Sequence, residues 1–128
     1  MAERSATTSG VAVVETLGEL RHVTWTGLLN GDTGAAVSLA EFADKSIQFS
    51  GTFGAGGTIV LQGSNDLTSP TNWFTLTDPQ TSAISKTAAA LEQVIEQTVW
   101  VRPSVTAGDG TTSLTARLLC RRGRGRAN

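Results

Sequence analysis

Several residue types on which common protein chemistries depend are scarce in this sequence. Its 128 residues include one cysteine, one histidine and no tyrosine, and lysine is rare. A lone cysteine, Cys120, cannot close a disulfide within the chain, and with a single histidine it cannot build a Cys/His metal site. These scarcities fit a protein that folds in a reducing cytoplasm. We expect no metal ion and no cofactor.

Long apolar runs are also missing. No stretch approaches the roughly 20 apolar residues that a transmembrane helix needs. Residues 1–10 are small and polar, without the apolar core of a secretory signal. The sequence therefore predicts a soluble protein that is made in the cytoplasm and has no membrane partner.

The residues that could act in catalysis do not form a recognisable catalytic pattern. A histidine-based triad would have to use His22, which lies inside a predicted strand with no nucleophile-elbow motif in the chain. Cys120 falls on the apolar face of the last predicted strand, where a free cysteine behaves as a small buried apolar residue. Glu92 and Glu96 are four residues apart, which on a helix places two like charges on one solvated face. We expect no catalytic residue and no enzymatic activity.

The acidic and glycine-rich loop segments also have structural explanations. Asp66, Asp78 and Asp109 fall in predicted turns, where aspartate is common because its side chain bonds to nearby backbone groups. The glycine-rich residues 54–57 lack the Lys-Ser/Thr ending of a phosphate-binding loop, and they join two predicted strands. We interpret all four segments as turns.

What the sequence has in abundance favours β structure. Threonine, serine, glycine and valine are frequent, and only 16% of the residues are charged. β-Branched residues suit a pleated surface, and glycines suit tight turns. The length is that of one domain. We predict an all-β, single-domain, two-sheet β-sandwich, with a jelly roll as the favoured form. The predicted strands are residues 11–14, 20–28, 45–53, 58–63, 73–77, 98–105 and 112–120.

Two pairs of these strands predict β-hairpins. Residues 45–53 alternate most cleanly between apolar and polar positions, as a half-buried strand does. A four-residue glycine-rich loop leads from this strand to residues 58–63. Another glycine-rich loop, residues 107–110, joins the last two predicted strands. Because short glycine-rich loops between strands are typical of hairpins, we expect the strands of each pair to be hydrogen-bonded neighbours.

Residues 87–97 allow two interpretations. They contain good helix formers, and Leu91, Val94 and Ile95 share one face of a helix, which predicts at most one short helix near residues 88–96. The alternative is an irregular strand that ends near Val94. The pattern does not decide between them.

Charge divides the chain into a mildly acidic body and a basic end. The last eight residues contain four arginines and no acid, which leaves 6 basic and 11 acidic residues elsewhere, a formal charge of −5. We divide the chain into a flexible arm at residues 1–10, a sandwich at 11–120 and a basic tail at 121–128. The tail is suited to contacting phosphates or an acidic protein surface, or to remaining solvated. It is short and has no aromatic residue, so we do not expect nucleic acid as the partner.

Two tryptophans are candidate interface residues. Trp73 precedes Phe74, and Trp100 lies between Val99 and Val101. If these apolar neighbours point to the core, both tryptophans point outward, where an exposed Trp is costly unless it anchors a partner. The alternative is a loop that covers them. The predicted interface residues are Trp73, Trp100, Arg121, Arg122, Arg124 and Arg126.

Two segments carry a resemblance to a known family. Residues 59–76, from Ile-Val-Leu-Gln-Gly-Ser-Asn-Asp to Asn-Trp-Phe-Thr-Leu, and residues 101–114, Val-Arg-Pro-Ser-Val-Thr-Ala-Gly-Asp-Gly-Thr-Thr-Ser-Leu, resemble the capsid cement, or decoration, proteins of tailed bacteriophages such as the Bordetella podovirus. The resemblance implies a jelly roll on the outside of the virion that binds the phage major capsid protein and clamps neighbouring subunits. It also implies a homodimer, made in the host cytoplasm, without catalytic residues.

Two other functions stay open. Gln62-Gly63-Ser64-Asn65-Asp66 and the tryptophan that follows also look like a discoidin-type carbohydrate-binding module. That family has a glycine after the Asn-Asp pair, where this chain has Leu67, and the absence of tyrosine counts against a sugar site. A phage tail or head-completion component would have the same chemistry with a different partner.

Overall fold

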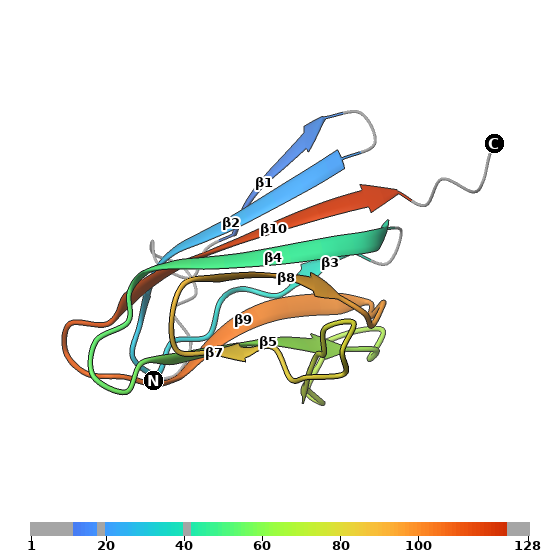
Figure 1. Ribbon diagram of the computed structural model, residues 1–128. Coiled ribbons are helices and arrows are strands. Elements are labelled where there is room, and N and C mark those ends of the chain that lie inside the picture. Colours follow the sequence, from blue (N-terminus) through green and yellow to red (C-terminus); the bar gives the residue numbers. More distant parts are fainter. Residues whose placement is uncertain (1–11, 18–19, 40–41, 123–128) are drawn as a thin grey trace.

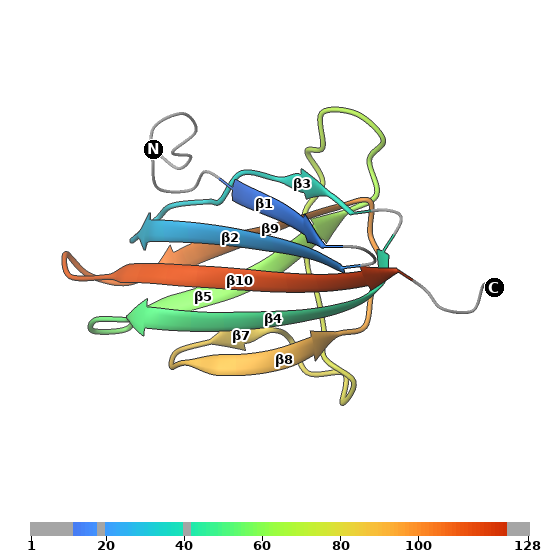
Figure 2. The same cartoon turned by 90° about the horizontal axis from the view of Figure 1, so that it is seen from above.

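The computed structural model describes residues 12–17, 20–39 and 42–122. Within them the chain forms ten strands and no helix, arranged as two antiparallel sheets packed face to face (Figures 1 and 2). The first sheet has the order β1-β2-β10-β4-β8, and the second has the order β3-β9-β5-β6, with β7 also paired to β5. The strands are β1 (Ala12–Leu17), β2 (Leu20–Leu29), β3 (Val37–Ser38), β4 (Phe42–Thr52), β5 (Thr58–Ser64), β6 (Phe74–Thr75), β7 (Ser85–Lys86), β8 (Ala90–Val94), β9 (Trp100–Ala107) and β10 (Ser113–Arg122).

The connectivity is that of a jelly roll. Strands β2, β10, β4 and β8 form one sheet in that order, and β3, β9, β5 and β6 form the other. Eight strands in two four-stranded layers, wound by repeated crossings between the layers, define this architecture. Strand β1 is an addition at the edge of the first sheet. The prediction of a two-sheet sandwich is confirmed, in its jelly-roll form.

Both predicted hairpins are wrong. Strand β4 pairs with β10 and β8, whereas β5 pairs with β9, β6 and β7 in the other sheet. Strands β9 and β10 likewise belong to different sheets. Each glycine-rich loop is therefore an arch that carries the chain from one layer to the other. An arch and a hairpin need the same glycines and the same flanking alternation, so the sequence pattern fits both.

The two arches lie against each other at one end of the sandwich. The amide of Ala55 donates to Oδ2 of Asp109 at 2.9 Å, and Oγ1 of Thr112 donates to the carbonyl of Phe53 at 2.8 Å. Hydrogen bonds from the Thr111 side chain, then from the backbone of Ala55 and Thr111, lower the pKa of Asp109 to about 2. One carboxylate thus fastens both arches and helps to hold the two layers together.

Residues 88–96 do not form the predicted helix. Residues Ala90–Val94 form β8, which pairs with β4 so that Gln48 lies opposite Leu91. Leu91 is exposed while Val94 is buried, so in this segment burial follows the sheet and not a helical face. The alternative interpretation, a strand ending near Val94, is confirmed.

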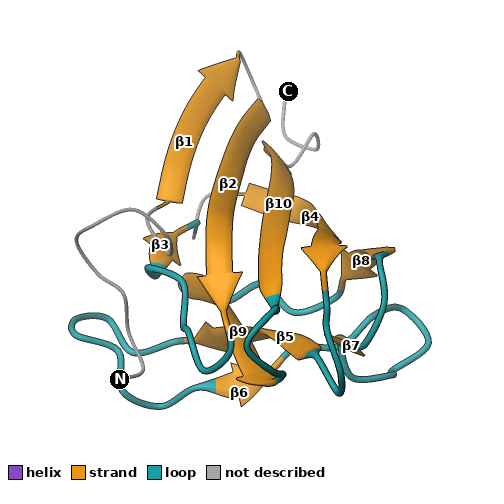
Figure 3. Cartoon of the chain, turned by 90° about the vertical axis from the view of Figure 1, so that its left-hand side faces the viewer, coloured by secondary structure: helices purple, strands orange, loops and turns teal. Residues whose placement is uncertain are grey.

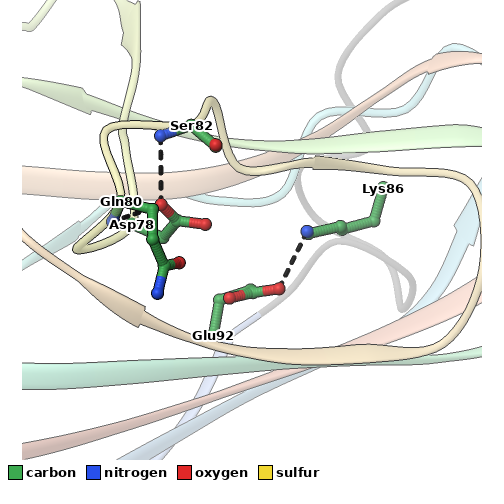
Figure 4. Close-up of polar contacts among 5 residues, drawn as sticks. All are labelled: Asp78, Gln80, Ser82, Lys86 and Glu92. Carbon is green, nitrogen blue, oxygen red and sulfur yellow. Dashed lines mark hydrogen bonds and ion pairs between the residues drawn. The ribbon is translucent and has the colours of Figure 1, made fainter.

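The edge of the first sheet at β8 is closed by contacts to the other layer. Nζ of Lys86, on β7, lies 2.8 Å from Oε2 of Glu92 (Figure 4). Glu96 accepts hydrogen bonds from the amide and hydroxyl of Thr77 at 2.8 and 2.6 Å. Burial raises the pKa of Glu96, but the bonds from Thr77 outweigh it and leave the pKa below its usual range. The prediction that Glu92 and Glu96 form a solvated pair is wrong, because each glutamate has a partner and is half-buried.

A neighbouring turn supports this closed edge. The carboxylate of Asp78 is buried and accepts hydrogen bonds from the amides of Gln80 and Ser82 at 2.9 and 3.0 Å (Figure 4). This is the backbone-bonding role expected for aspartate in a turn.

The core lies between the two sheets. Its largest fully buried side chains are Trp25, Phe42 and Phe49. Cys120 is completely buried, as its place on the apolar face of the last strand predicts, and burial raises the pKa of its thiol to about 11. Strand alternation alone sets this pattern, because β4 and β10 bury every second residue over most of their length.

Lys45 is an exception within this core. It lies on the inward face of β4, opposite Cys120, with only 3% of its surface exposed. Its ammonium group donates to the carbonyl of Phe42 at 3.1 Å. Burial lowers its pKa, and the nearby Cys120 and Asp44 offset only part of that effect. The Lys45 ammonium group is therefore held in the core by a backbone hydrogen bond, at a cost in stability.

We expect Lys45→Met to stabilise the protein by about 1–2 kcal/mol at pH 7, because it removes a buried charge and keeps the side-chain volume. Since the pKa of Lys45 is lowered in the folded state, the cost of its charge is full below that pKa and disappears as pH rises toward 10.5. Urea unfolding of both proteins at pH 7 and at alkaline pH measures this. The advantage of the variant should shrink at alkaline pH, and a variant less stable at pH 7 would contradict the argument.

Candidate interaction surface

The outer face of the second sheet carries both candidate tryptophans. Along β9, the side chains of Val101 and Val105 are buried in the core, so Trp100 and Arg102 point outward. On the adjacent β5, Gln62 lies directly opposite Arg102. The alternation of two neighbouring strands therefore places a tryptophan, an arginine and a glutamine together on one surface.

Hydrogen bonds and stacking fix these side chains in place. The guanidinium carbon of Arg102 lies 4.0 Å from the centre of the Trp73 ring, and Nε of Arg102 donates to Oε1 of Gln62 at 2.9 Å. Nε1 of Trp100 donates to the carbonyl of Asp66 at 2.8 Å. Each of the four side chains is half-buried. We call these four residues, Gln62, Trp73, Trp100 and Arg102, the tryptophan patch.

The loop of residues 65–73 borders the tryptophan patch and is held by Asp66. Its carboxylate accepts hydrogen bonds from the amides of Thr71 and Asn72 at 2.9 and 3.0 Å, and these bonds lower the pKa of Asp66. The amide of Val99 donates to the Asn65 side chain at 3.0 Å and anchors the start of the loop to the strand beside it. A loop tied at both ends loses little further entropy on contacting a partner.

Two large apolar side chains of this region are exposed. Leu67, in the loop, is 80% exposed, and Phe74, in β6, is 69% exposed. Phe74 lies opposite Gly63, on the core-facing side of the sheet and not on the side of Gln62, but at this edge it is exposed, and Leu76 supplies the buried apolar side chain of the segment. Leu67 follows Asp66, whose carbonyl accepts a hydrogen bond from the Trp100 indole, so an exposed apolar residue borders the tryptophan patch, as in a protein-interface core.

The predicted arginines lie elsewhere. Arg121 and Arg122 belong to β10, in the first sheet, so the predicted basic tail begins as strand. The guanidinium carbon of Arg122 lies 5.2 Å from the Phe42 ring centre. Figure 1 shows the end of β10 and the start of β9 at the same end of the sandwich. The remaining interface residues, Arg124 and Arg126, and the predicted arm at residues 1–10 lie outside the described residues.

His22 and Cys120 do not form a catalytic pair. Their strands are neighbours, but Cys120 lies opposite Arg21 on the inner face, whereas His22 lies on the outer face near Glu15, with 3.9 Å between Nδ1 and Oε1. Within the described residues, no three His, Cys, Asp or Glu side chains group as metal ligands would. No helix long and apolar enough to span a membrane occurs there either.

Sequence reasoning did not identify Gln62 and Arg102 as part of this surface. The signal was present, because Trp100 and Arg102 are two residues apart in a predicted strand and must share a face. The contact between Arg102 and Trp73 joins residues 29 positions apart in the sequence. The order β9-β5-β6 in the second sheet brings these two segments together.

Comparisons with known proteins place the fold. No protein-family model and no curated protein sequence matches the chain. Its structure is similar to that of the SPBc2 prophage-derived protein YomS, at 14% sequence identity and a TM-score of 0.57, over 84% of this chain and 97% of YomS. It also resembles protein NMB1881 from Neisseria meningitidis, at 8% identity and a TM-score of 0.46, over 91% and 89% of the two chains. The chain shares its fold with YomS.

Proposed function

We propose that this chain is a structural protein of a tailed-phage virion that binds the outer surface of the major capsid shell and clamps neighbouring subunits. The sequence resemblance to capsid cement proteins supports this, and so does a fold shared with a prophage-derived protein. The chain is then made in the host cytoplasm, assembles on the capsid exterior and acts there as a homodimer. The observation that carries the proposal is the tryptophan patch with the exposed Leu67 in the loop that borders it.

The tryptophan patch suits a rigid protein surface as its partner. Tryptophan and arginine dominate the residues that contribute most to binding energy in protein interfaces. Here Arg102 and Trp100 are already fixed by the contacts to Gln62 and Asp66, so little side-chain entropy is lost on binding. A shell presents many identical sites, and a clamp that spans two subunits gains affinity from engaging both.

A carbohydrate site is the less favoured function. A sugar ring binds tryptophan by stacking on an open face of the indole, and Arg102 covers one face of Trp73. A tail or head-completion role would use the same surface on a different assembly, so only the choice of partner separates it from the capsid role.

Co-sedimentation tests the proposal. The purified chain is mixed with undecorated capsid shells of the phage whose genome encodes it, at low and high salt. We expect stoichiometric binding by the wild type and binding about 30-fold weaker for Leu67→Asp, which corresponds to a loss of about 2 kcal/mol. Leu91→Asp is the matched control, because Leu91 is 65% exposed on the first sheet and should bind as the wild type does.

The other outcomes point to other partners. A wild type that stays in the supernatant at every salt concentration overturns capsid binding. Binding to a glycan array that Leu67→Asp abolishes would support the carbohydrate module instead, and binding to isolated tails would support the tail component. Release from shells at high salt would assign part of the affinity to the arginines at the end of β10.

A further inference from the structure

Strand β1 leaves one edge of the first sheet open. It pairs with β2 along its whole length, and no strand of the described residues pairs with its other side. The other sheet edges offer less. Strands β3 and β6 have two residues each, and β8 has five and is tied to the second layer by the Lys86–Glu92 ion pair and by a hydrogen bond from the Ile95 amide to the Thr77 carbonyl just past its end. Figure 3 shows β1 as the outermost strand of the first sheet. Among the described strands, β1 therefore offers the longest unpaired edge.

The β1 edge has few of the features that prevent pairing with another chain. Natural edge strands are protected by charged residues, above all lysine, by proline, by bulges or by short length. Strand β1, Ala-Val-Val-Glu-Thr-Leu, has one charged residue, Glu15, and no lysine, proline or bulge, and its register with β2 runs uninterrupted from Ala12 to Leu17. Val13 and Val14 are 57% and 47% exposed. A weakly protected strand with apolar residues on both faces is a template for a further strand.

We propose that β1 pairs with β1 of a second copy of this chain, antiparallel, so that the two first sheets become one continuous sheet. A strand that pairs antiparallel with its own copy does so across a two-fold axis perpendicular to the sheet. This axis keeps the inner faces of both copies on the same side. Both second sheets then lie on one side of the joined sheet, which gives a two-armed molecule.

The symmetry also fixes the register. Residues directly opposite each other share a face, so an axis that preserves faces must pass through a residue position and not between two positions. An axis at Glu15 places two carboxylates opposite each other, which is unfavourable. An axis at Val13 leaves only a short overlap. An axis at Val14 overlaps the strand most fully without opposing like charges. Because Val14 lies opposite the buried Val23, the two Val14 side chains meet on the inner face.

Cysteine crosslinking tests this register. With Val14 on the axis, the two Cα atoms lie about 4.5–5.5 Å apart, within the roughly 4.4–6.8 Å that a disulfide spans. We expect Val14→Cys to form a covalent dimer under mild oxidation. The native Cys120 is fully buried and does not interfere. Leu91→Cys, on the other outer strand of the same sheet, is the matched control and should crosslink at least tenfold more slowly.

A second variant gives an independent readout. Val14→Lys places two ammonium groups opposite each other on the axis, and sedimentation velocity should show a monomer at concentrations where the wild type dimerises. The side chain is half-exposed, so the variant should keep the circular dichroism spectrum of the fold. A wild type that stays monomeric, with Val14→Cys no faster than Leu91→Cys, would overturn the proposal. Faster crosslinking through Leu91→Cys would place the interface on β8 and overturn it as well.

The dimer is measured in solution without capsids, so its failure and the failure of capsid binding are separate results. A chain that dimerises through β1 and does not bind shells would leave this inference standing alone. A chain that binds shells as a monomer would support capsid binding and overturn the β1 dimer.

Discussion

Trp25→Ala is expected to remove most of the stability of the fold. Trp25, on β2, is completely buried, and Nε1 donates to the carbonyl of Ala35 at 2.8 Å. The indole packs against the backbone of Gly34 so closely that a Cβ there would lie 2.8 Å from Cδ1. Truncating a buried tryptophan costs about 3–5 kcal/mol, and the unpaired carbonyl adds about 1 kcal/mol or more. The total free energy of unfolding of a domain of this kind is roughly 5–15 kcal/mol.

Urea unfolding followed by circular dichroism measures this loss. Trp25→Phe is the matched variant, because it keeps a ring in the cavity and removes only the hydrogen bond and part of the volume. Its free energy of unfolding should fall by about half as much as that of Trp25→Ala. Trp100→Ala should lose less still, since Trp100 is half-exposed. A loss below about 1.5 kcal/mol for Trp25→Ala would mean that the cavity collapses around the site.

Gly57→Ala is expected to be the most damaging single methyl addition, at about 3 kcal/mol or more. A Cβ on Gly57 would lie 1.9 Å from the carbonyl oxygen of Phe53 and 2.6 Å from its carbonyl carbon, both of them backbone atoms that cannot swing aside. The same oxygen accepts the hydrogen bond from Thr112. Moving it to make room would separate the first arch from the second.

The adjacent residue supplies the control. Gly56 has φ +71°, and a Cβ there would meet nothing within 4 Å. Gly56→Ala therefore incurs only the cost of the left-handed backbone conformation, roughly 1–2 kcal/mol. Thermal melts of the two variants separate a steric clash from a backbone preference. Equal losses would show that the clash at Gly57 is relieved by movement of the arch.

Local patterns determined most of the fold and left its connectivity open. Alternation in residues 45–53 located β4 and its buried face, because a half-buried strand must alternate. It could not determine whether the loop after Thr52 is a hairpin or an arch, since both reverse the chain with the same glycines. The predicted jelly roll requires arches at these positions, so long-range topology should have overruled the local hairpin pattern.

The candidate surface was only partly predictable for a related reason. Face parity placed Trp100 outward, next to the buried Val101. At Phe74 parity gave the core-facing side, but not the exposure, because a two-residue strand at the sheet edge has little core to face. The open edge at β1 was not predictable at all. A strand at residues 11–14 was expected, but whether a strand has one neighbour or two depends on the whole sheet order.

The position of β10 has a consequence for synthesis of the protein. This strand is the last along the described chain, yet it lies between β2 and β4 at the centre of the first sheet. On the ribosome, the earlier strands emerge without the one that joins them, for several seconds at about 5–20 residues per second. The first sheet therefore cannot close until β10 has left the ribosome, and until then chaperones can bind the nascent chain with β2 and β4 unjoined.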